Sequence, residues 1–195
     1  MNTPTERIIL GIDPGTRIMG YGVIRVKDSK LSVIRYGIIN LTKYANQALK
    51  LKRIAERVNE LIESYMPDEM ALEAPFYGKN VQTTLKLGRA QGVAMATALV
   101  KGIPIAEYAP RRIKLAVTGS GSASKEQVAA MLKQILNFKP EKEIKLDATD
   151  ALGVAVCHYF QNGYTNNNAV TKTAKKSNNW ADFIKENPDK VKKNN

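Results

Sequence analysis

The sequence predicts an α/β protein in which a mixed sheet of about five strands carries helices on its faces. Five short apolar runs have the length of buried strands, and the longer segments between and after them repeat apolar residues at helical spacing. The order is three strands, helix, strand, helix, strand and three helices, which is typical of an α/β layer arrangement. With 195 residues, 44% of them apolar, the chain fits one domain that builds its own core.

The strands are expected where apolar runs end at turn-forming residues. The first run, RIILGID, ends in Asp13 and is followed by Pro14 and Gly15, so it predicts a buried strand entering a turn. The next two runs are separated only by Lys27–Lys30, which favours an antiparallel arrangement of strands one to three. The predicted strands are 7–13, 20–26, 31–41, 70–73 and 103–107.

The helices are expected from apolar spacing and from their end signals. Pro67 ends the first helix, and Pro110 stands at the first position of the third, where proline is favoured. Ser124 and Gln127 form a capping box in front of the fourth. The predicted helices are 45–65, 80–101, a helix from Pro110, 128–138 and an amphipathic helix 147–161.

The charge of the chain indicates a polyanionic partner. Thirty Lys and Arg residues against 18 Asp and Glu give a formal charge of +12, which favours nucleic acid first and an anionic membrane surface second. No apolar run is long enough to span a membrane, and the N-terminus lacks the basic start of a secretory signal. We therefore expect a soluble, cytoplasmic protein without a membrane partner, and the single Cys157 excludes an internal disulfide.

The composition changes near residue 162. Residues 163–195 contain eight Asn and seven Lys but only three acidic residues, so this segment carries 7 − 3 = +4. Such a segment has too few apolar residues to offset its ordering entropy. We expect a domain over 1–162 followed by a basic, disordered tail over 163–195.

Four carboxylates stand in places where a charge is costly. Asp13 and Glu73 each close an apolar strand, and Asp147 and Asp150 lie three apart on one helix face. A buried carboxylate is costly unless it is paired or binds a metal, and oxygen ligands suit Mg²⁺ or Mn²⁺. Two such ions can activate water for attack on a phosphodiester. The alternatives are a turn residue at Asp13, a helix cap at Asp147 and a first-turn acid at Asp150.

The surrounding motifs resemble those of a known family. LGIDPGT at 10–16, followed by GYGVI at 20–24, resembles the opening of the RuvC family of Holliday junction resolvases. EAPFYGKNVQTTLKLGRAQG at 73–92 is similar to that family's second signature, segments within 107–125 to its third, and DATDALGVA at 147–155 to its fourth. The resemblance covers residues 7–161 in uninterrupted order.

The resemblance implies a fold, an activity and partners. The fold is RNase H-like, and the activity is Mg²⁺-dependent nicking of two opposed strands of a four-way DNA junction by a homodimer, in recombination and repair. Asp13, Glu73, Asp147 and Asp150 match the family's acidic positions, where two Mg²⁺ ions bind and Mn²⁺ can substitute. RuvA and RuvB, the branch-migration proteins, are the implied protein partners.

Several neighbours of the acids are candidate DNA contacts. Phe76 either packs inward or stacks on a base, and its match to the family's base-contacting aromatic favours stacking. Lys114 and Lys125 match basic positions of the third signature, and Lys125 also lies in the first turn of a capped helix, where an anion is favoured. The remaining candidate DNA contacts are Lys79, Asn80 and Arg112.

Three other functions compete with this interpretation. An actin-like or sugar-kinase-like ATPase shares the first motif but needs two lobes. A noncatalytic DNA-binding protein explains the charge but not acids at strand ends, since carboxylates repel phosphates unless metal lies between them. An RNase H-like nuclease acting on another nucleic-acid structure stays open on the acids alone.

Two further features are noted. Gly88 and Gly92 lie four apart on a predicted helix, which indicates close approach of another backbone, either the sheet or a twin subunit. His158, the only histidine, receives no role.

Overall fold

The computed structural model describes residues 6–75, 80–139 and 146–168, with side chains as far as Gln161. The chain divides into two units, Met1–Gly163 and Tyr164–Asn195. The assignment of 1–162 and 163–195 to a nuclease domain and a tail stays a prediction.

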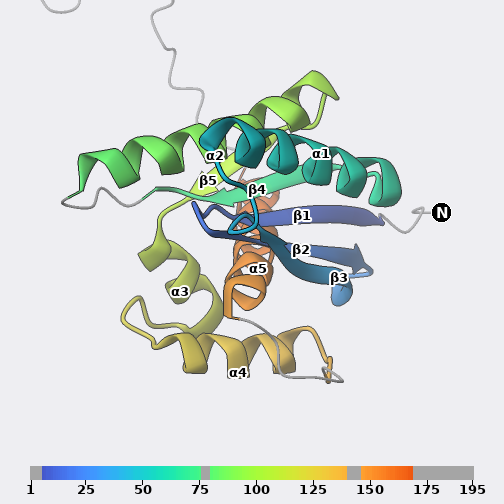
Figure 1. Cartoon of the computed structure of the whole chain (residues 1–195). Helices are drawn as coiled ribbons and strands as arrows, with labels where there is room; N and C mark the ends of the chain where they lie inside the picture. Colours follow the sequence, from blue (N-terminus) through green and yellow to red (C-terminus); the bar gives the residue numbers. More distant parts are fainter. Residues whose placement is uncertain (1–5, 76–79, 140–145, 169–195) are drawn as a thin grey trace, which may run out of the picture. The chain divides into compact units, whose positions relative to one another are not determined.

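The sheet has the predicted five strands. The strands β1 (Arg7–Asp13), β2 (Ile18–Lys27) and β3 (Lys30–Asn40) pair antiparallel, whereas β4 (Glu69–Glu73) pairs parallel with β1 and β5 (Ile105–Tyr108) parallel with β4. The order across the sheet is β3-β2-β1-β4-β5 (Figure 1). Because β1, β4 and β5 run in the same direction, their carboxyl ends meet at one edge.

Five helices cover the sheet in the described residues, on both faces as predicted. The helices are α1 (Gln47–Tyr65), α2 (Val81–Val100), α3 (Pro110–Thr118), α4 (Lys125–Ile135) and α5 (Leu146–Asn168). Pro110 begins α3, and the capping box of Ser124 and Gln127 is formed. Figure 1 shows α1 and α2 on one face and α5, with α3 and α4, on the other.

Each face of the sheet has its own core. Odd and even residues of β1 point to opposite faces, so Leu10 and Ile12 pack with α1 and α2, whereas Ile9 packs with α4 and α5. The residues of α5 that follow Asp147 are buried almost all round, from Ala148 to His158 with Asp150 half-buried. The prediction of an amphipathic helix ending at Gln161 was therefore wrong: α5 lies between the sheet and α4, and it runs seven residues further, to Asn168.

Glycines on the sheet allow α5 to approach it closely. A Cβ atom added to Gly11, Gly20 or Gly22 would lie under 3.0 Å from Ala151, Asp147 or Leu152 of α5, respectively. Such a separation is too short for real atoms, so these positions admit only hydrogen. The three glycines thus let the first two turns of α5 lie directly against β1 and β2.

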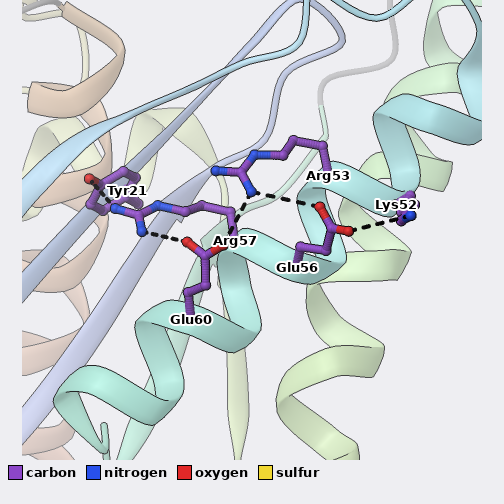
Figure 2. A network of polar contacts seen from close by, with 6 residues as sticks. All are labelled: Tyr21, Lys52, Arg53, Glu56, Arg57 and Glu60. Carbon is purple, nitrogen blue, oxygen red and sulfur yellow. Dashed lines mark hydrogen bonds and ion pairs between the residues drawn. The ribbon is translucent and has the colours of Figure 1, made fainter.

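On the opposite face, an ion-pair network ties α1 to the sheet (Figure 2). Arg57 donates to the Tyr21 hydroxyl at 3.0 Å and lies 5.2 Å from the centre of its ring. The carboxylates of Glu56 and Glu60 form ion pairs with Lys52, Arg53 and Arg57 at 2.7–3.7 Å. Every charge in this network has a partner of opposite sign within the fold.

Candidate active site

The candidate active site lies where β1 and β4 end. Asp13 closes β1 and Glu73 closes β4, and these parallel neighbours bring the two carboxylates to the same edge of the sheet. Asp13 shares its face with Gly11, which touches α5, so both acids lie on the side of α5. Asp150 joins them from α5. These three acids line one pocket of about 250 Å³ together with Pro110, Ile113, Lys114, Lys125 and Val128.

Asp147 lies beside this pocket and is not among its lining residues. Its backbone carbonyl packs on Gly20, which is the β2 partner of Asp13. Its negative charge also contributes to raising the pKa of Asp13. The structure therefore brings three of the four predicted acids into one pocket and places the fourth close enough to act electrostatically on Asp13.

The pocket holds its carboxylates at an electrostatic cost. Burial, followed by the charges of Glu73 and Asp150, raises the pKa of Asp13 from 3.8 to about 8. Burial and the charge of Asp150 also raise the pKa of Glu73. Like charges gathered in a partly buried site disfavour ionisation, so a cation bound there would relieve the repulsion.

Two lysines bring positive charge to these acids. The Lys125 ammonium, in the first turn of α4, donates to the Asp150 carboxylate. Burial alone would lower the pKa of Lys125, but this hydrogen bond and the charges of Asp150 and Asp13 raise it above the ordinary value. Lys114 opposes the rise in the pKa of Glu73. Lys125 therefore stays charged beside the acids.

The donor set suits a hard divalent cation. The pocket offers carboxylate oxygens, the ligands that Mg²⁺ and Mn²⁺ prefer. Across the residues with described placement, no three His, Cys, Asp or Glu side chains are arranged to hold an ion as they stand. The Asp150 carboxylate accepts from Lys125 in this arrangement.

The other predicted contacts are distributed more widely. Arg112 donates to Gln161 of α5 and does not line the pocket. The side chain of Asn80 caps α2 by accepting from the Thr83 amide at 3.1 Å. Phe76 and Lys79 lie outside the described residues.

Two features of the site escaped the sequence analysis. The first is the role of Gly20 and Gly22, whose alternation on one strand face is a signal of close packing that could have been found. The second is a buried polar chain around His158, which contacts Glu69 at 2.6 Å and Tyr108 at 2.8 Å, while Arg7 pairs with Glu69 at 3.4 Å. Burial lowers the pKa of His158, so this chain joins α5 to β4 and β5 through a largely neutral ring.

The fold and the site together define a class of protein. Carboxylates at the ends of two parallel strands, joined by carboxylates of a helix on a 3-2-1-4-5 sheet, are the arrangement of an RNase H-like nuclease. Comparison with known proteins then specifies the family. The sequence profile described as "Crossover junction endodeoxyribonuclease RuvC" matches residues 9–158, and the chain belongs to the RuvC family.

Relatives support this assignment over nearly the whole chain. The crossover junction endodeoxyribonuclease RuvC of Cytophaga hutchinsonii is 60% identical over 187 residues, covering 96% of this chain and 89% of that protein. The RuvC of Bacteroides fragilis is 57% identical, covering 96% and 97%. The structure of Thermus thermophilus RuvC in complex with Holliday junction substrate is 30% identical, with a TM-score of 0.76, and covers 82% of this chain and 96% of that chain.

Proposed function

We propose that the chain is a metal-dependent endonuclease that resolves four-way DNA junctions by symmetric nicking of two opposed strands in recombination and repair. The observation that carries the proposal is the pocket in which Asp13, Glu73 and Asp150 meet Lys114 and Lys125. Acids alone would repel a DNA phosphate, and lysines alone would bind it without cutting. Membership of the RuvC family supplies the substrate class, since a relative's structure holds a Holliday junction substrate.

Each residue has a distinct task in this proposal. Asp13, Glu73 and Asp150, with Asp147 beside them, would hold the metal. Bound divalent ions activate water and stabilise the leaving oxygen of the phosphodiester. Lys114 and Lys125 orient the phosphate at the mouth of the pocket, and Lys125 has the first-turn position in α4 where backbone N–H groups favour an anion.

We propose two Mg²⁺ ions per site, with Mn²⁺ able to substitute. The family is one of metal-dependent nucleases, and the identity and number of ions are the finer part of the proposal. The pKa of Asp13, raised to about 8 by burial and neighbouring carboxylates, supports a site that takes up positive charge. Asp13, Glu73, Asp147 and Asp150 would hold these ions between them.

A homodimer follows from symmetric nicking, because one subunit carries one pocket. The exposed face of α2 offers a contact surface for the second copy: Val81, Leu85 and Leu99 are 51–69% exposed, and Gly88 and Gly92 lie on the same stripe. A Cβ at either glycine would meet nothing within 4 Å, so the sheet is not the close neighbour that these glycines indicated. Leu85→Glu should give a monomer in analytical ultracentrifugation, whereas Leu115→Glu on α3 should stay dimeric. A dimeric Leu85→Glu variant would exclude this face.

The partners and location follow from the same proposal. RuvA and RuvB would act beside the enzyme, as the resemblance implies, and the proposed location is the cytoplasm. None of the helices with described placement is long and apolar enough to cross a membrane.

The decisive experiment compares substrates. A labelled four-way junction, a linear duplex of the same sequence and an RNA–DNA hybrid are incubated with the protein and Mg²⁺. Paired nicks in the junction, absent with chelator and far slower in the other two substrates, are expected. Equal cleavage of all three would indicate an RNase H-like nuclease of a different specificity.

A further inference from the structure

A second pocket lies on the opposite face of the sheet from the acids and is lined by positive charge. It has a volume of about 310 Å³ and is formed by the turn after β1, the beginning of α1 and the first turns of α2. Its lining contains Arg17, Lys50 and Lys86, and also Thr16, Ala45, Asn46, Gln47 and Thr83. We call it the basic pocket.

The cations of the basic pocket lack the ion-pair partners that neighbouring cations on α1 have. Lys52 and Arg53, two and three residues beyond Lys50 on the same helix, are ion-paired with Glu56 (Figure 2). Among the described residues, no carboxylate lies within ion-pair distance of Arg17, Lys50 or Lys86. Three convergent cations from three separate segments repel one another unless an anion joins them.

Hydrogen bonds hold Lys50 and the beginning of α1 in place at the basic pocket. The Lys50 ammonium donates to the Thr16 carbonyl at 3.5 Å, which holds it over the turn. Asn46 caps α1 by accepting from the Leu49 amide at 3.0 Å. The N–H groups of Gln47 and Ala48 precede the first intrahelical donor, so helix geometry gives them no acceptor within α1. The pocket therefore adds a helix N-terminus to its three cations.

The lining also excludes several ligands. The lining residues that the structure describes include no carboxylate, so they disfavour a metal cation, and they include no aromatic ring on which a base could stack. Threonine hydroxyls and an asparagine add polar groups of the kind that contact phosphate. The chemistry fits a phosphate group recognised without regard to the base it carries.

The position of the pocket indicates where that phosphate comes from. Thr16 is three residues after Asp13, so their Cα atoms lie within about 11 Å of each other. The acid pocket is on the α5 face and the basic pocket is on the α1 and α2 face of the same sheet edge. A DNA strand that crosses this edge places a phosphate there within roughly three nucleotides of the cut, at about 3.4 Å per nucleotide.

We infer that the basic pocket binds one backbone phosphate of the DNA substrate, outside the cleaved step, through Arg17, Lys50 and Lys86. This inference rests on the proposed function, since a DNA substrate supplies the phosphate. The basic pocket would then fix the path of the DNA strand over the edge of the sheet, because the acids alone do not determine that path.

The test is the salt dependence of junction binding. Fluorescence anisotropy with a labelled junction, in chelator to prevent cleavage, is measured for wild type and for Arg17→Gln, Lys50→Gln, Lys86→Gln and the triple variant. Each single variant should weaken binding by roughly threefold to tenfold. Because three cations share one phosphate, the triple variant should lower the slope of log K against log salt by about one. Lys52→Gln, a paired cation on the same helix, is the matched control and should change little.

Each other outcome overturns the inference. If the triple variant lowered the slope by about three, or if Lys52→Gln weakened binding as much as Lys50→Gln, these residues would contribute only general surface charge and the pocket would not bind a single phosphate. Titration calorimetry with inorganic phosphate separates the sources: phosphate binding that the triple variant loses, with unchanged DNA affinity, would assign the pocket to a free phosphate. Wild-type cleavage is assayed in parallel, so a protein that cuts junctions without any pocket effect refutes this inference alone. A protein that shows the pocket effect but never cuts refutes the proposed function alone.

Discussion

The network on α1 and the acid pocket are two clusters of charge with opposite electrostatic character. On α1, Glu56 and Glu60 form ion pairs with three basic side chains, and each charge has a partner of opposite sign (Figure 2). In the acid pocket, Asp13 and Glu73 line the same cavity as Asp150, and Asp150 is ion-paired with Lys125. The pKa of Glu60 is lowered, chiefly by its hydrogen bond to Arg57, whereas burial raises that of Asp13 to about 8. The carboxylates on α1 that stabilise the fold have ion-pair partners within it. In the acid pocket, Asp13 and Glu73 lie among other carboxylates, and we expect a ligand to supply the balancing charge.

The strongest test of this comparison exchanges one carboxylate for an amide in each cluster. Glu73→Gln should reduce junction cleavage by roughly 10³-fold or more, because a metal ligand is lost, while leaving junction affinity in chelator within about twofold. Glu60→Gln should leave cleavage unchanged. Single-turnover cleavage and anisotropy measure the two quantities, and equal activity of both variants would contradict the functional distinction.

The next test leaves every charge in place and moves the helix that carries two of them. Gly20→Ala puts a methyl group against the backbone of Asp147, so the first turn of α5 must shift. A displacement of about 1 Å can cost roughly 10²-fold in rate, and we expect such a loss of cleavage. Gly153→Ala on α5 is the control, since its Cβ would meet Ile113 at an ordinary 3.5 Å. Full activity of Gly20→Ala would show that α5 need not lie so close.

The position of the acids at one edge was predictable because it depends on local signals. Asp13 and Glu73 each end an apolar run, and parallel neighbouring strands necessarily bring such ends together. Turn residues and helix caps are equally local, so Pro110 and Ser124 marked helix starts that the structure has. Four ordered motifs added the family and its fold.

The rest depended on contacts between distant segments. The burial of α5 on all sides requires α4 as well as the sheet, and helical periodicity does not show a second covering layer. Whether Arg112 or Lys114 lines the pocket depends on the rotation of α3 about its axis, which sequence does not fix. The hydrogen bond of His158 joins residues 89 apart in the chain, and no spacing rule predicts such a pair.

A third test measures how much the ionised Asp13 carboxylate in the acid pocket lowers the free energy of unfolding. Burial and the neighbouring carboxylates raise the pKa of Asp13 to about 8 in the folded protein, against an ordinary value of 3.8. Its contribution to stability is therefore fully present below pH 3.8 and is lost as the pH rises through about 8. Without metal, Asp13→Asn should be more stable than wild type near pH 9 by about 1–3 kcal/mol, after allowing for screening by water at the pocket mouth.

Urea denaturation in chelator from about pH 4 to pH 9 measures this difference. The stability advantage of the variant should shrink toward the acid end, as Asp13 becomes protonated in the folded state first and then, near its ordinary pKa of 3.8, in the unfolded state as well. Added Mg²⁺ should raise the unfolding free energy of wild type more than that of the variant. An Asp13→Asn variant that is less stable at every pH would mean that the carboxylate serves the fold.

The smallest effect is expected from the balanced cluster. Arg57→Met removes the donor to Glu60 and the cation over the Tyr21 ring while keeping much of the apolar stem. Half-exposed ion pairs and cation–π contacts each contribute about 0.5–1 kcal/mol, so the unfolding free energy should fall by about 1 kcal/mol with cleavage unchanged. Glu73→Gln should show the reverse pattern, with activity lost and stability retained. If Arg57→Met instead lost cleavage at full stability, α1 would belong to the functional surface, and pairing within the fold would no longer separate structural from functional charge.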